Sequence, residues 1–160
     1  MINVIDKRAF RDCCGQFLTG VTVITTVDTE GNDVGITANS FTSVSLEPPL
    51  VLVCIDNKIH SFDAFRNAKS YAVHILTENQ EKISGFFATK GADKFSSVET
   101  ETGINNIPLL KDYLVRMECN VVNQVEAGDH IILIGEVQSL QRSNEDRKPL
   151  GFYSGKYVKL

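Results

Sequence analysis

The residues best suited to chemistry in this chain are small polar ones that lie between two apolar runs in the segment 34–56. Residues 37–45 supply hydroxyl and amide side chains, and Pro48 and Pro49 separate them from the apolar run 50–55. A strand cannot easily continue through the two prolines, because neither has an N–H for the ladder. Small side chains leave backbone N–H groups open, and hydroxyls both donate and accept hydrogen bonds. The segment suits a flat ligand with apolar faces and polar edges, such as a flavin; an ordinary Ser/Thr-rich pair of antiparallel strands is the alternative.

Four separate motifs, taken in chain order, resemble the flavin reductase-like family, and the similarity runs from about Arg8 to Leu160. The motifs are a helix-to-strand junction at 17–26, the segment 37–52, a Gly-Asp-His turn with the following strand at 127–137, and the C-terminal stretch 149–157. Motifs of this kind are weak evidence one at a time. Their common order along one chain makes the resemblance specific.

The resemblance implies one domain over residues 1–160, a mainly β, FMN-binding split β-barrel that is antiparallel and Greek-key-like, with a few flanking helices. It also implies an NAD(P)H:flavin oxidoreductase that transfers hydride to FMN or FAD, forms a homodimer, and supplies diffusible reduced flavin to a partner monooxygenase. The choices between FMN and FAD and between NADH and NADPH stay open. Two other functions stay open: a flavoprotein that holds flavin tightly for electron transfer, and a non-catalytic flavin-binding module.

The resemblance assigns cofactor-binding roles to twelve residues in three groups. Thr37, Ala38, Asn39 and Ser40 are assigned to the flavin ring and ribityl chain, Cys54, Ile55, Asp56 and Asn57 to the ring or tail, and Lys58, Ser61, Phe87 and Ala88 to the phosphate and a nearby helix end. A cation beside a helix N-terminus favours an anion. The alternatives are a surface lysine at Lys58, a plain helix cap at Ser61 and core packing at Phe87. Cys54 stands where the family commonly has Ser, and residues 57–60 replace a more basic run, so the flavin preference is not settled by the resemblance.

His130 is the catalytic candidate, because it follows the turn made by Gly128 and Asp129 and enters a strand at its mouth. An imidazole there can contact a nicotinamide nucleotide, and the resemblance places the nicotinamide beside it; a solvated turn histidine is the alternative. Tyr153 and Tyr157 are assigned to the nicotinamide as well, with C-terminal packing as the alternative. His74 lies inside an apolar strand and is interpreted as a hydrogen-bonded structural residue.

Composition excludes several other classes of protein. A net charge of −4 and a pI near 5.4 argue against a nucleic-acid binder. No apolar run approaches the ~18 residues of a membrane span, and residues 1–6 do not resemble a signal peptide. Four cysteines without a C-x-x-C pair indicate reduced thiols in a cytoplasm, and no zinc-site spacing occurs. The Rossmann and Walker signatures are absent as well.

Apolar periodicity predicts the elements that must position these residues. Asp6 is predicted to cap a first helix that ends near Gly20 and turns its apolar stripe, with Cys13 and Cys14, toward the core. Further helices are predicted at 61–68 and 79–88, strands at 21–27, 34–37, 40–45, 50–55, 71–76, 113–121 and 131–134, and surface loops at 28–32, 89–106 and 143–149. The alternation in 113–121 turns Arg116 outward, and the continuous apolar run 131–134 predicts burial on both faces. Short strands joined by tight turns favour a closed or nearly closed antiparallel barrel.

Overall fold

The computed structural model describes residues 4–91 and 93–160. Its helices are α1 (Lys7–Cys14), α2 (Phe62–Arg66), α3 (Glu81–Ala88) and the short 3₁₀ helix η1 (Ile104–Asn106). Its strands are β1 (Thr19–Gly20), β2 (Thr22–Val27), β3 (Asp33–Ala38), β4 (Phe41–Leu46), β5 (Pro49–Asp56), β6 (Ser70–Ile75), β7 (Thr100–Thr102), β8 (Pro108–Leu110), β9 (Val115–Ala127), β10 (His130–Arg142), β11 (Leu150–Tyr153) and β12 (Lys156–Lys159).

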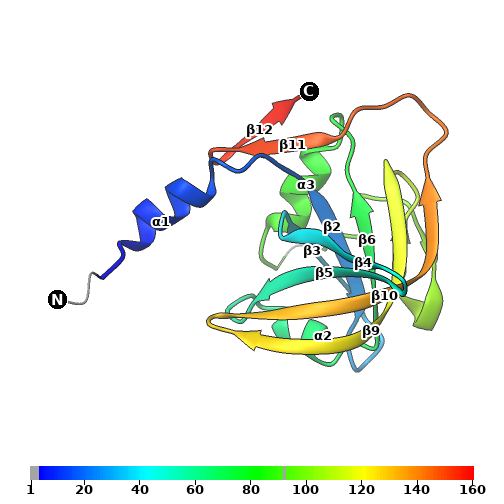
Figure 1. The fold of residues 1–160 in the computed structure, drawn as a ribbon. Helices are drawn as coiled ribbons and strands as arrows, with labels where there is room; N and C mark the ends of the chain where they lie inside the picture. The colour runs from blue at the N-terminus through cyan, green and yellow to red at the C-terminus, as the bar shows by residue number, and fades with distance from the viewer. Residues whose placement is uncertain (1–3, 92) are drawn as a thin grey trace.

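Seven of these strands form one antiparallel sheet that curls around the main core (Figure 1). Their order is β3-β2-β6-β9-β10-β5-β4, while β1, β11 and β12 form a separate small sheet and β7 pairs with β8. The core inside the curled sheet is built from fully buried side chains of β2, β5, β6 and β10, such as Ile24, Ile55, Val73 and Leu133. The prediction of a mainly β, antiparallel fold with few helices is confirmed.

The first helix begins as predicted but does not pack as predicted. The Asp6 carboxylate accepts a hydrogen bond of 2.8 Å from the Ala9 N–H, which is the expected N-cap. No residue of α1 is buried, however, and Cys13 and Cys14 are both exposed. Figure 1 shows α1 projecting away from the barrel as an arm. The predicted core-facing position of this helix is therefore wrong, because nothing within residues 4–91 and 93–160 covers its apolar stripe.

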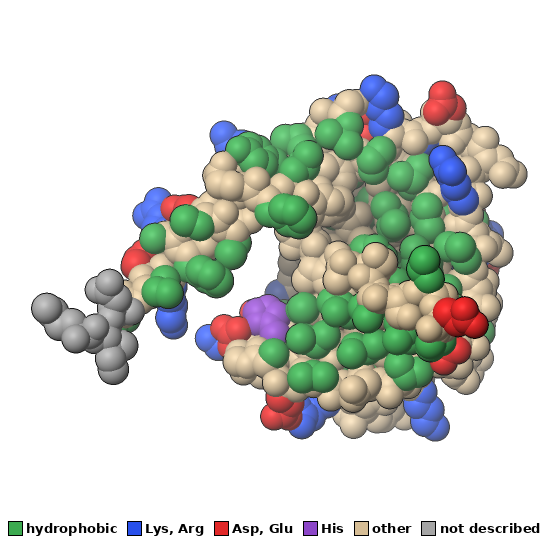
Figure 2. All heavy atoms as spheres, viewed as in Figure 1, with side chains coloured by type: hydrophobic (Ala, Val, Ile, Leu, Met, Phe, Trp, Pro, Cys, Tyr) green, Lys and Arg blue, Asp and Glu red, His purple; other side chains and the backbone are tan. Residues whose placement is uncertain are grey.

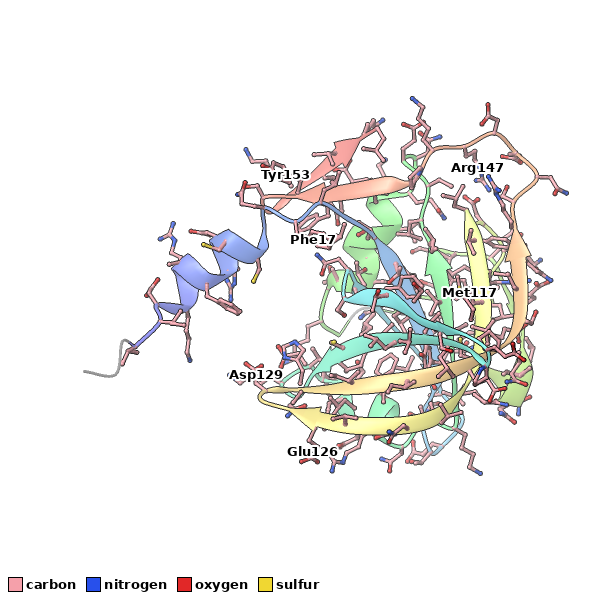
Figure 3. All side chains as sticks on the ribbon, in the orientation of Figure 1. Phe17, Met117, Glu126, Asp129, Arg147 and Tyr153 are labelled. Atoms are coloured by element: carbon pink, nitrogen blue, oxygen red, sulfur yellow. The ribbon has the colours of Figure 1, made fainter. Side chains whose placement is uncertain are left out.

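The arm is fastened to the body at its base by the turn between β11 and β12. The Ser154 N–H donates to the Gly15 carbonyl at 2.8 Å, and the Tyr153 hydroxyl donates to the Gln16 side-chain oxygen at 2.7 Å. Tyr153 and Phe17 lie at this junction (Figure 3). These contacts hold the base of the arm, so the direction of α1 is set by the C-terminal hairpin.

Two strand predictions also need correction. In β10, Ile131 and Leu133 are buried but Ile132 and Ile134 are only half-buried, so one face of this strand is not covered. In β9, Arg116 is buried rather than exposed, because its guanidinium pairs with Glu101 at 2.6 Å and donates to the Leu110 carbonyl at 3.1 Å. Buried charges require such partners.

The other predicted helices and strands are present, but several boundaries differ. The predicted strands 113–121 and 131–134 are the longer β9 and β10, the first helix ends at Cys14 rather than near Gly20, and β8, β11 and β12 were not predicted. The predicted loop 89–106 contains β7 and η1 near its end, which short segments without periodicity do not reveal. His74 is fully buried, with Nδ1 3.0 Å from the Val23 carbonyl and Nε2 accepting the Leu110 N–H at 3.0 Å. Its predicted structural role is confirmed, and burial lowers its pKa to about 4.

Candidate functional site

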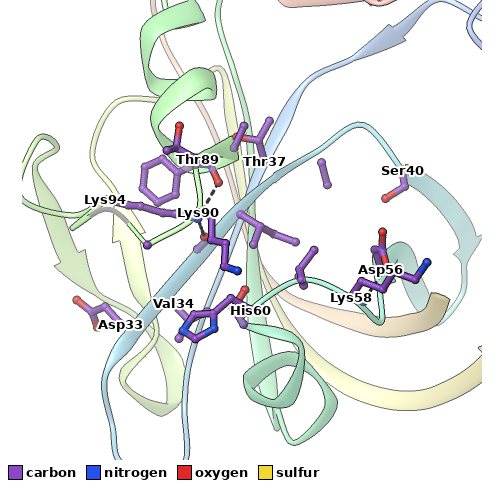
Figure 4. A pocket seen from close by; sticks show the side chains of 18 of the residues that line it. Asp33, Val34, Thr37, Ser40, Asp56, Lys58, His60, Thr89, Lys90 and Lys94 are labelled. Carbon is purple, nitrogen blue, oxygen red and sulfur yellow. Dashed lines mark hydrogen bonds between the residues drawn. The ribbon is translucent and has the colours of Figure 1, made fainter. Parts of the chain in front are cut away.

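A pocket of about 700 Å³ lies at one end of the curled sheet (Figure 4). Its walls come from β3 and the link to β4, from the end of β5 and the loop to α2, from the end of α3, and from the tip of the β9–β10 hairpin. It is lined by residues 33–40, Cys54, Asp56, residues 58–61, residues 87–91, residues 93–95 and His130. Small-molecule pockets are commonly about 300–1,000 Å³, so this one has the size of a ligand site.

Two hydroxyl groups hold the walls of the pocket together. The Thr37 hydroxyl of β3 donates to the Ser84 carbonyl of α3 at 2.5 Å. The Ser40 hydroxyl donates to the Cys54 carbonyl at 2.8 Å and accepts the Cys54 N–H at 3.2 Å. Both hydroxyls keep acceptor capacity toward a ligand. The side-chain amide of Asn39, by contrast, is exposed and makes no recorded hydrogen bond within the described residues.

The wall formed by β3 and the end of α3 is shaped by close packing between these two elements. A Cβ built on Gly35 would lie 2.5 Å from the Phe87 ring, so the ring occupies the space that any other side chain would need. Phe95 packs edge-on against Phe87, with 5.2 Å between ring centroids. Phe87 is almost fully buried and also lines the pocket. Core packing and a place in the candidate site are thus compatible for this residue.

Another wall of the pocket forms where the end of β5 meets the β9–β10 hairpin. His130 pairs in register with Asp56, and the Asn57 N–H donates to the Asp129 carbonyl at 2.9 Å. The His130 Nδ1 lies 2.7 Å from an Asp129 carboxylate oxygen, and 40% of the His130 side chain is exposed. This hydrogen bond to His130 and the nearby charges of His130 and Lys58 lower the pKa of Asp129. Figure 3 shows Asp129 at the hairpin tip.

The structure brings most of the predicted site residues into this one pocket. Those that line it are Thr37, Ala38, Asn39, Ser40, Cys54, Asp56, Lys58, Ser61, Phe87, Ala88 and His130. Burial raises the pKa of the Cys54 thiol, which keeps it protonated at neutral pH. Ser61 precedes α2 but makes no side-chain cap hydrogen bond, so its hydroxyl is not used as the plain helix cap of the alternative interpretation.

Four predicted residues do not line the pocket. Ile55 is fully buried in the core on the opposite face of β5, and Asn57 contributes its backbone N–H to the hairpin contact. The Tyr157 hydroxyl lies 2.6 Å from the Ser84 hydroxyl, and its ring packs against Phe152. Tyr153 is used at the base of the arm. Their assigned contacts with cofactor remain predictions.

Sequence reasoning missed the far end of the pocket. The residues that it did not assign are 33–36, Ile59, His60, Thr89, Gly91 and residues 93–95. Lys90 follows Phe87 and Ala88 at the helix end that the resemblance places near the flavin. Residues 34–36 belong to the predicted strand 34–37 that carries the assigned Thr37, so continuity along this strand could have included them. Residues 93–95 lie in a segment without periodicity, so no sequence signal indicated that they line the pocket.

The chemistry of the walls fits a flavin nucleotide. Such a ligand has a planar ring with apolar faces and polar edges and a tail that carries phosphate. Apolar surface comes from Val34, Ile36, Ala38 and Phe87, hydrogen-bonding edges from Asn39 and Ser40, and positive charge from Lys58, Lys90 and Lys94. In residues 4–91 and 93–160 no three His, Cys, Asp or Glu side chains form a group that could hold a metal ion. No helix in the same ranges is long and apolar enough to cross a membrane.

Comparison with known proteins agrees with this geometry. The family model described as "Flavin reductase like domain" matches residues 14–160. The chain belongs to this family. It is 40% identical over 157 residues to the flavin-dependent monooxygenase reductase subunit HsaB of Rhodococcus jostii (strain RHA1), covering 98% of this chain and 79% of HsaB. The chain spans 49% and 66% of the lengths of two relatives from Rhizobium meliloti (strain 1021), so it matches about half to two thirds of those proteins.

Solved structures share the fold of this flavin reductase-like chain. The flavin reductase PheA2 in its native state has a TM-score of 0.86 at 44% identity, over 98% of this chain and 99% of that one. The Streptomyces globisporus NADH:FAD oxidoreductase SgcE6, in complex with NAD and FAD fragments, has a TM-score of 0.89 at 34% identity, over 99% and 96% of the two chains.

Proposed function

We propose that this chain is an NAD(P)H-dependent flavin reductase, which transfers a hydride from NADH or NADPH to FMN or FAD. The observation that carries the proposal is the single pocket in which small polar residues 37–40, the end of β5 and His130 meet. Named relatives support it: the FMN reductase (NADH) SmoA of Agrobacterium fabrum is 38% identical over 152 residues, and SgcE6 is an NADH:FAD oxidoreductase. The released reduced flavin would serve a partner monooxygenase, since relatives such as HsaB are reductase subunits of such enzymes.

In this proposal the bound flavin supplies the redox chemistry, and the protein supplies binding and orientation. Asn39 and the backbone of residues 37–40 would hold the ring edge, and Lys58 and Ser61 would hold the phosphate. His130 stands at the rim with Nδ1 engaged by Asp129, which leaves Nε2 for a nicotinamide nucleotide. No nucleophile or carboxylate pair is required for hydride transfer.

A steady-state assay tests the proposal against its rival, a protein that binds flavin tightly without reducing it. The purified chain is mixed with FMN or FAD and with NADH or NADPH, and nicotinamide oxidation is followed by absorbance. We expect oxidation above the rate in free solution only when flavin is present, from a protein that is faintly coloured or colourless as purified. Strong yellow colour together with no oxidation above that rate would favour the tight-binding alternative.

We further propose that the working unit is a homodimer, because two apolar surfaces face the same hollow beside the pocket. One is the arm, with Phe10 61% and Phe17 77% exposed. The other is the partly exposed face of β5 and β10, which includes Leu52, Ile132 and Ile134. Figure 2 shows green apolar side chains on both sides of the hollow, with a histidine at its rim. A second copy offers the same two surfaces and can cover both.

Light scattering during gel filtration tests the dimer. The parent chain is expected to elute as a dimer, and the double variant Phe10→Ser with Phe17→Ser as a monomer. Asp12→Ser, on the polar side of the same helix, is the matched control and should remain a dimer. A parent chain that is monomeric at micromolar concentration would overturn this part of the proposal.

A further inference from the structure

A second cavity, of about 640 Å³, lies apart from the candidate flavin pocket. Its walls come from the start of α3, the segment 97–99, the segment 110–113 and the loop between β10 and β11. Among the described residues, none lines both cavities. Figure 3 shows Arg147, which lines the second cavity, in that loop, on the side of the barrel away from the arm. The volume is in the usual range for small-molecule sites, about 300–1,000 Å³, and the proposed reductase reaction does not use this cavity.

One part of the cavity wall is apolar. It is supplied by Ile83 of α3, Val98 and Leu110. These three side chains belong to the same apolar cluster as Phe87. Leu110 is almost fully buried, while Ile83 and Val98 are half-buried. Apolar surface that is partly open inside a cavity favours a ligand with an apolar body.

The rest of the wall carries charges, and most of them are paired. The Lys111 ammonium lies 3.6 Å from the Glu99 carboxylate. The Arg147 guanidinium engages both Asp112 and Glu145, the latter at 3.1 Å. Two further hydrogen bonds, of 2.8 and 3.0 Å, hold the same guanidinium. All three carboxylates of the lining therefore have a cationic partner, and Arg147 is fixed in place.

Arg142 differs from the other charged residues of this cavity. It is the last residue of β10, lines the cavity and is exposed. Within residues 4–91 and 93–160 its guanidinium makes no recorded ion pair. The lining carries three cations and three carboxylates, so its total charge is zero and its attraction for an anion depends on Arg142. A guanidinium matches a carboxylate well, because it can donate two parallel hydrogen bonds.

We propose that this cavity binds a small organic anion, with Arg142 holding its carboxylate and the apolar wall holding its apolar body. Such binding is separate from the proposed function and does not depend on it. The guanidinium can turn toward a ligand without breaking a recorded ion pair. An exposed arginine loses side-chain freedom when it binds, however, so the charge alone gives little affinity and the apolar contact is needed as well.

Isothermal titration calorimetry with three probes tests the proposal. The probes are benzoate, its neutral analogue benzamide, and inorganic phosphate, which is an anion without an apolar body. Each is titrated into the parent chain, Arg142→Met, Arg142→Lys and the control Lys69→Met, with and without saturating FMN. Lys69 is exposed and lies outside both cavities, so Lys69→Met makes the same change in net charge as Arg142→Met.

We expect the parent chain to bind benzoate saturably, with the same affinity in the presence and absence of FMN. Arg142→Met should weaken benzoate binding about ten- to a hundredfold, the usual range for a hydrogen bond to a charged group. Arg142→Lys keeps the charge without the paired donors and should have an intermediate affinity. Lys69→Met should bind benzoate like the parent. Benzamide and phosphate should both bind the parent more weakly than benzoate.

Four results would overturn the proposal. They are no saturable binding of benzoate at millimolar concentration, loss of benzoate binding when FMN is present, equal affinity for benzoate and either of the other probes, and unchanged benzoate affinity in Arg142→Met. Loss of binding with FMN would mean that benzoate occupies the flavin pocket instead. None of these results bears on whether the chain reduces flavin, and a chain that binds no flavin would still be tested by the titrations without FMN.

Discussion

The hydroxyl groups of Ser84 and Tyr157 lie 2.6 Å apart, which links the C-terminal hairpin to helix α3. The carbonyl of the same Ser84 accepts the Thr37 hydroxyl from the pocket wall. Ser84 is fully buried, so its hydroxyl depends on the tyrosine for a partner. The last strand of the chain is therefore connected through one residue to the candidate flavin site.

Replacing Tyr157 with Phe should lower the free energy of unfolding by about 1–3 kcal/mol, because the fully buried Ser84 hydroxyl loses its partner. Because the tyrosine hydroxyl is occupied by Ser84, the Michaelis constant for the nicotinamide should not change. Denaturant unfolding and steady-state kinetics measure the two quantities. Tyr153→Phe is the matched control: its hydroxyl bonds the side chain of Gln16 in an exposed contact, and the loss should be smaller. A raised Michaelis constant with unchanged stability would instead place Tyr157 against the nicotinamide.

Replacing Asn39 with Ala should weaken flavin binding about three- to twelvefold, which corresponds to the loss of a hydrogen bond worth about 0.5–1.5 kcal/mol. The Asn39 amide is exposed at the pocket and makes no recorded hydrogen bond in the described part of the chain, so the fold should be unaffected. Fluorescence titration measures the affinity. Asn144→Ala, at an exposed position remote from the pocket, should bind flavin like the parent; an Asn39→Ala variant that does the same would remove Asn39 from the site.

Much of the site could be predicted because its residues lie in strands and turns that have recognisable sequence patterns. The family resemblance assigned residues 37–40 and the end of β5 to the same cofactor, and the Gly-Asp-His turn placed His130 at the mouth of β10. Ile55 was assigned to the cofactor as well, but its side chain is buried in the core and does not line the pocket. Strict alternation along β5 puts Cys54 and Asp56 on one face and Ile55 on the other, so the sequence held the information for that correction.

Other features could not be read from local pattern. The apolar stripe of α1 shows that the helix needs a covering surface, but periodicity does not say whether that surface belongs to the same chain. The half-burial of Ile132 and Ile134 could not be predicted for the same reason. A continuous apolar run is compatible with a strand covered on both faces by its own chain and with a strand that has one face partly exposed. Lys94 lies in a segment without periodicity, and only the folded chain brings it to Gly35.

Replacing His130 with Ala should impair the nicotinamide step more than flavin binding. The residue stands at the pocket rim, partly exposed, and Asp129 engages its Nδ1. A contact made equally in the ground and transition states would raise the Michaelis constant for the nicotinamide alone. A contact that aligns the ring for hydride transfer would lower the turnover number.

Stopped-flow reduction of flavin across nicotinamide concentrations separates these two effects for His130→Ala. Asp129→Asn is the companion variant: it keeps a hydrogen-bonding group beside Nδ1 while removing the charge, and it should show the same effect in weaker form. Flavin affinity, measured separately, should stay within about twofold of the parent. If His130→Ala reduces flavin with the parent's rate and nicotinamide affinity, His130 is a solvated hairpin residue and has no role in the reaction.

The stability of the fold should fall as the pH drops from 6.5 toward 4, because of His74. This histidine is fully buried, and burial lowers its pKa from 6.5 to about 4, with the nearby Arg116 acting in the same direction. Between these values the unfolded chain binds a proton at this position and the folded chain does not. Protonation therefore favours the unfolded state, and His74 removes up to roughly 3 kcal/mol of stability over this window.

His74→Asn isolates this contribution, because asparagine can still hydrogen-bond in the strand but does not titrate. The variant is expected to be less stable than the parent at pH 7, where it loses the paired contacts with Val23 and Leu110. Its disadvantage should shrink as the pH falls, since only the parent takes up a proton on unfolding. Urea unfolding at pH 7, 6, 5 and 4.5 measures both curves, and carboxylate titration, common to both proteins, cancels in their difference. If the difference in unfolding free energy between the two proteins stays constant with pH, protonation of His74 does not destabilise the fold.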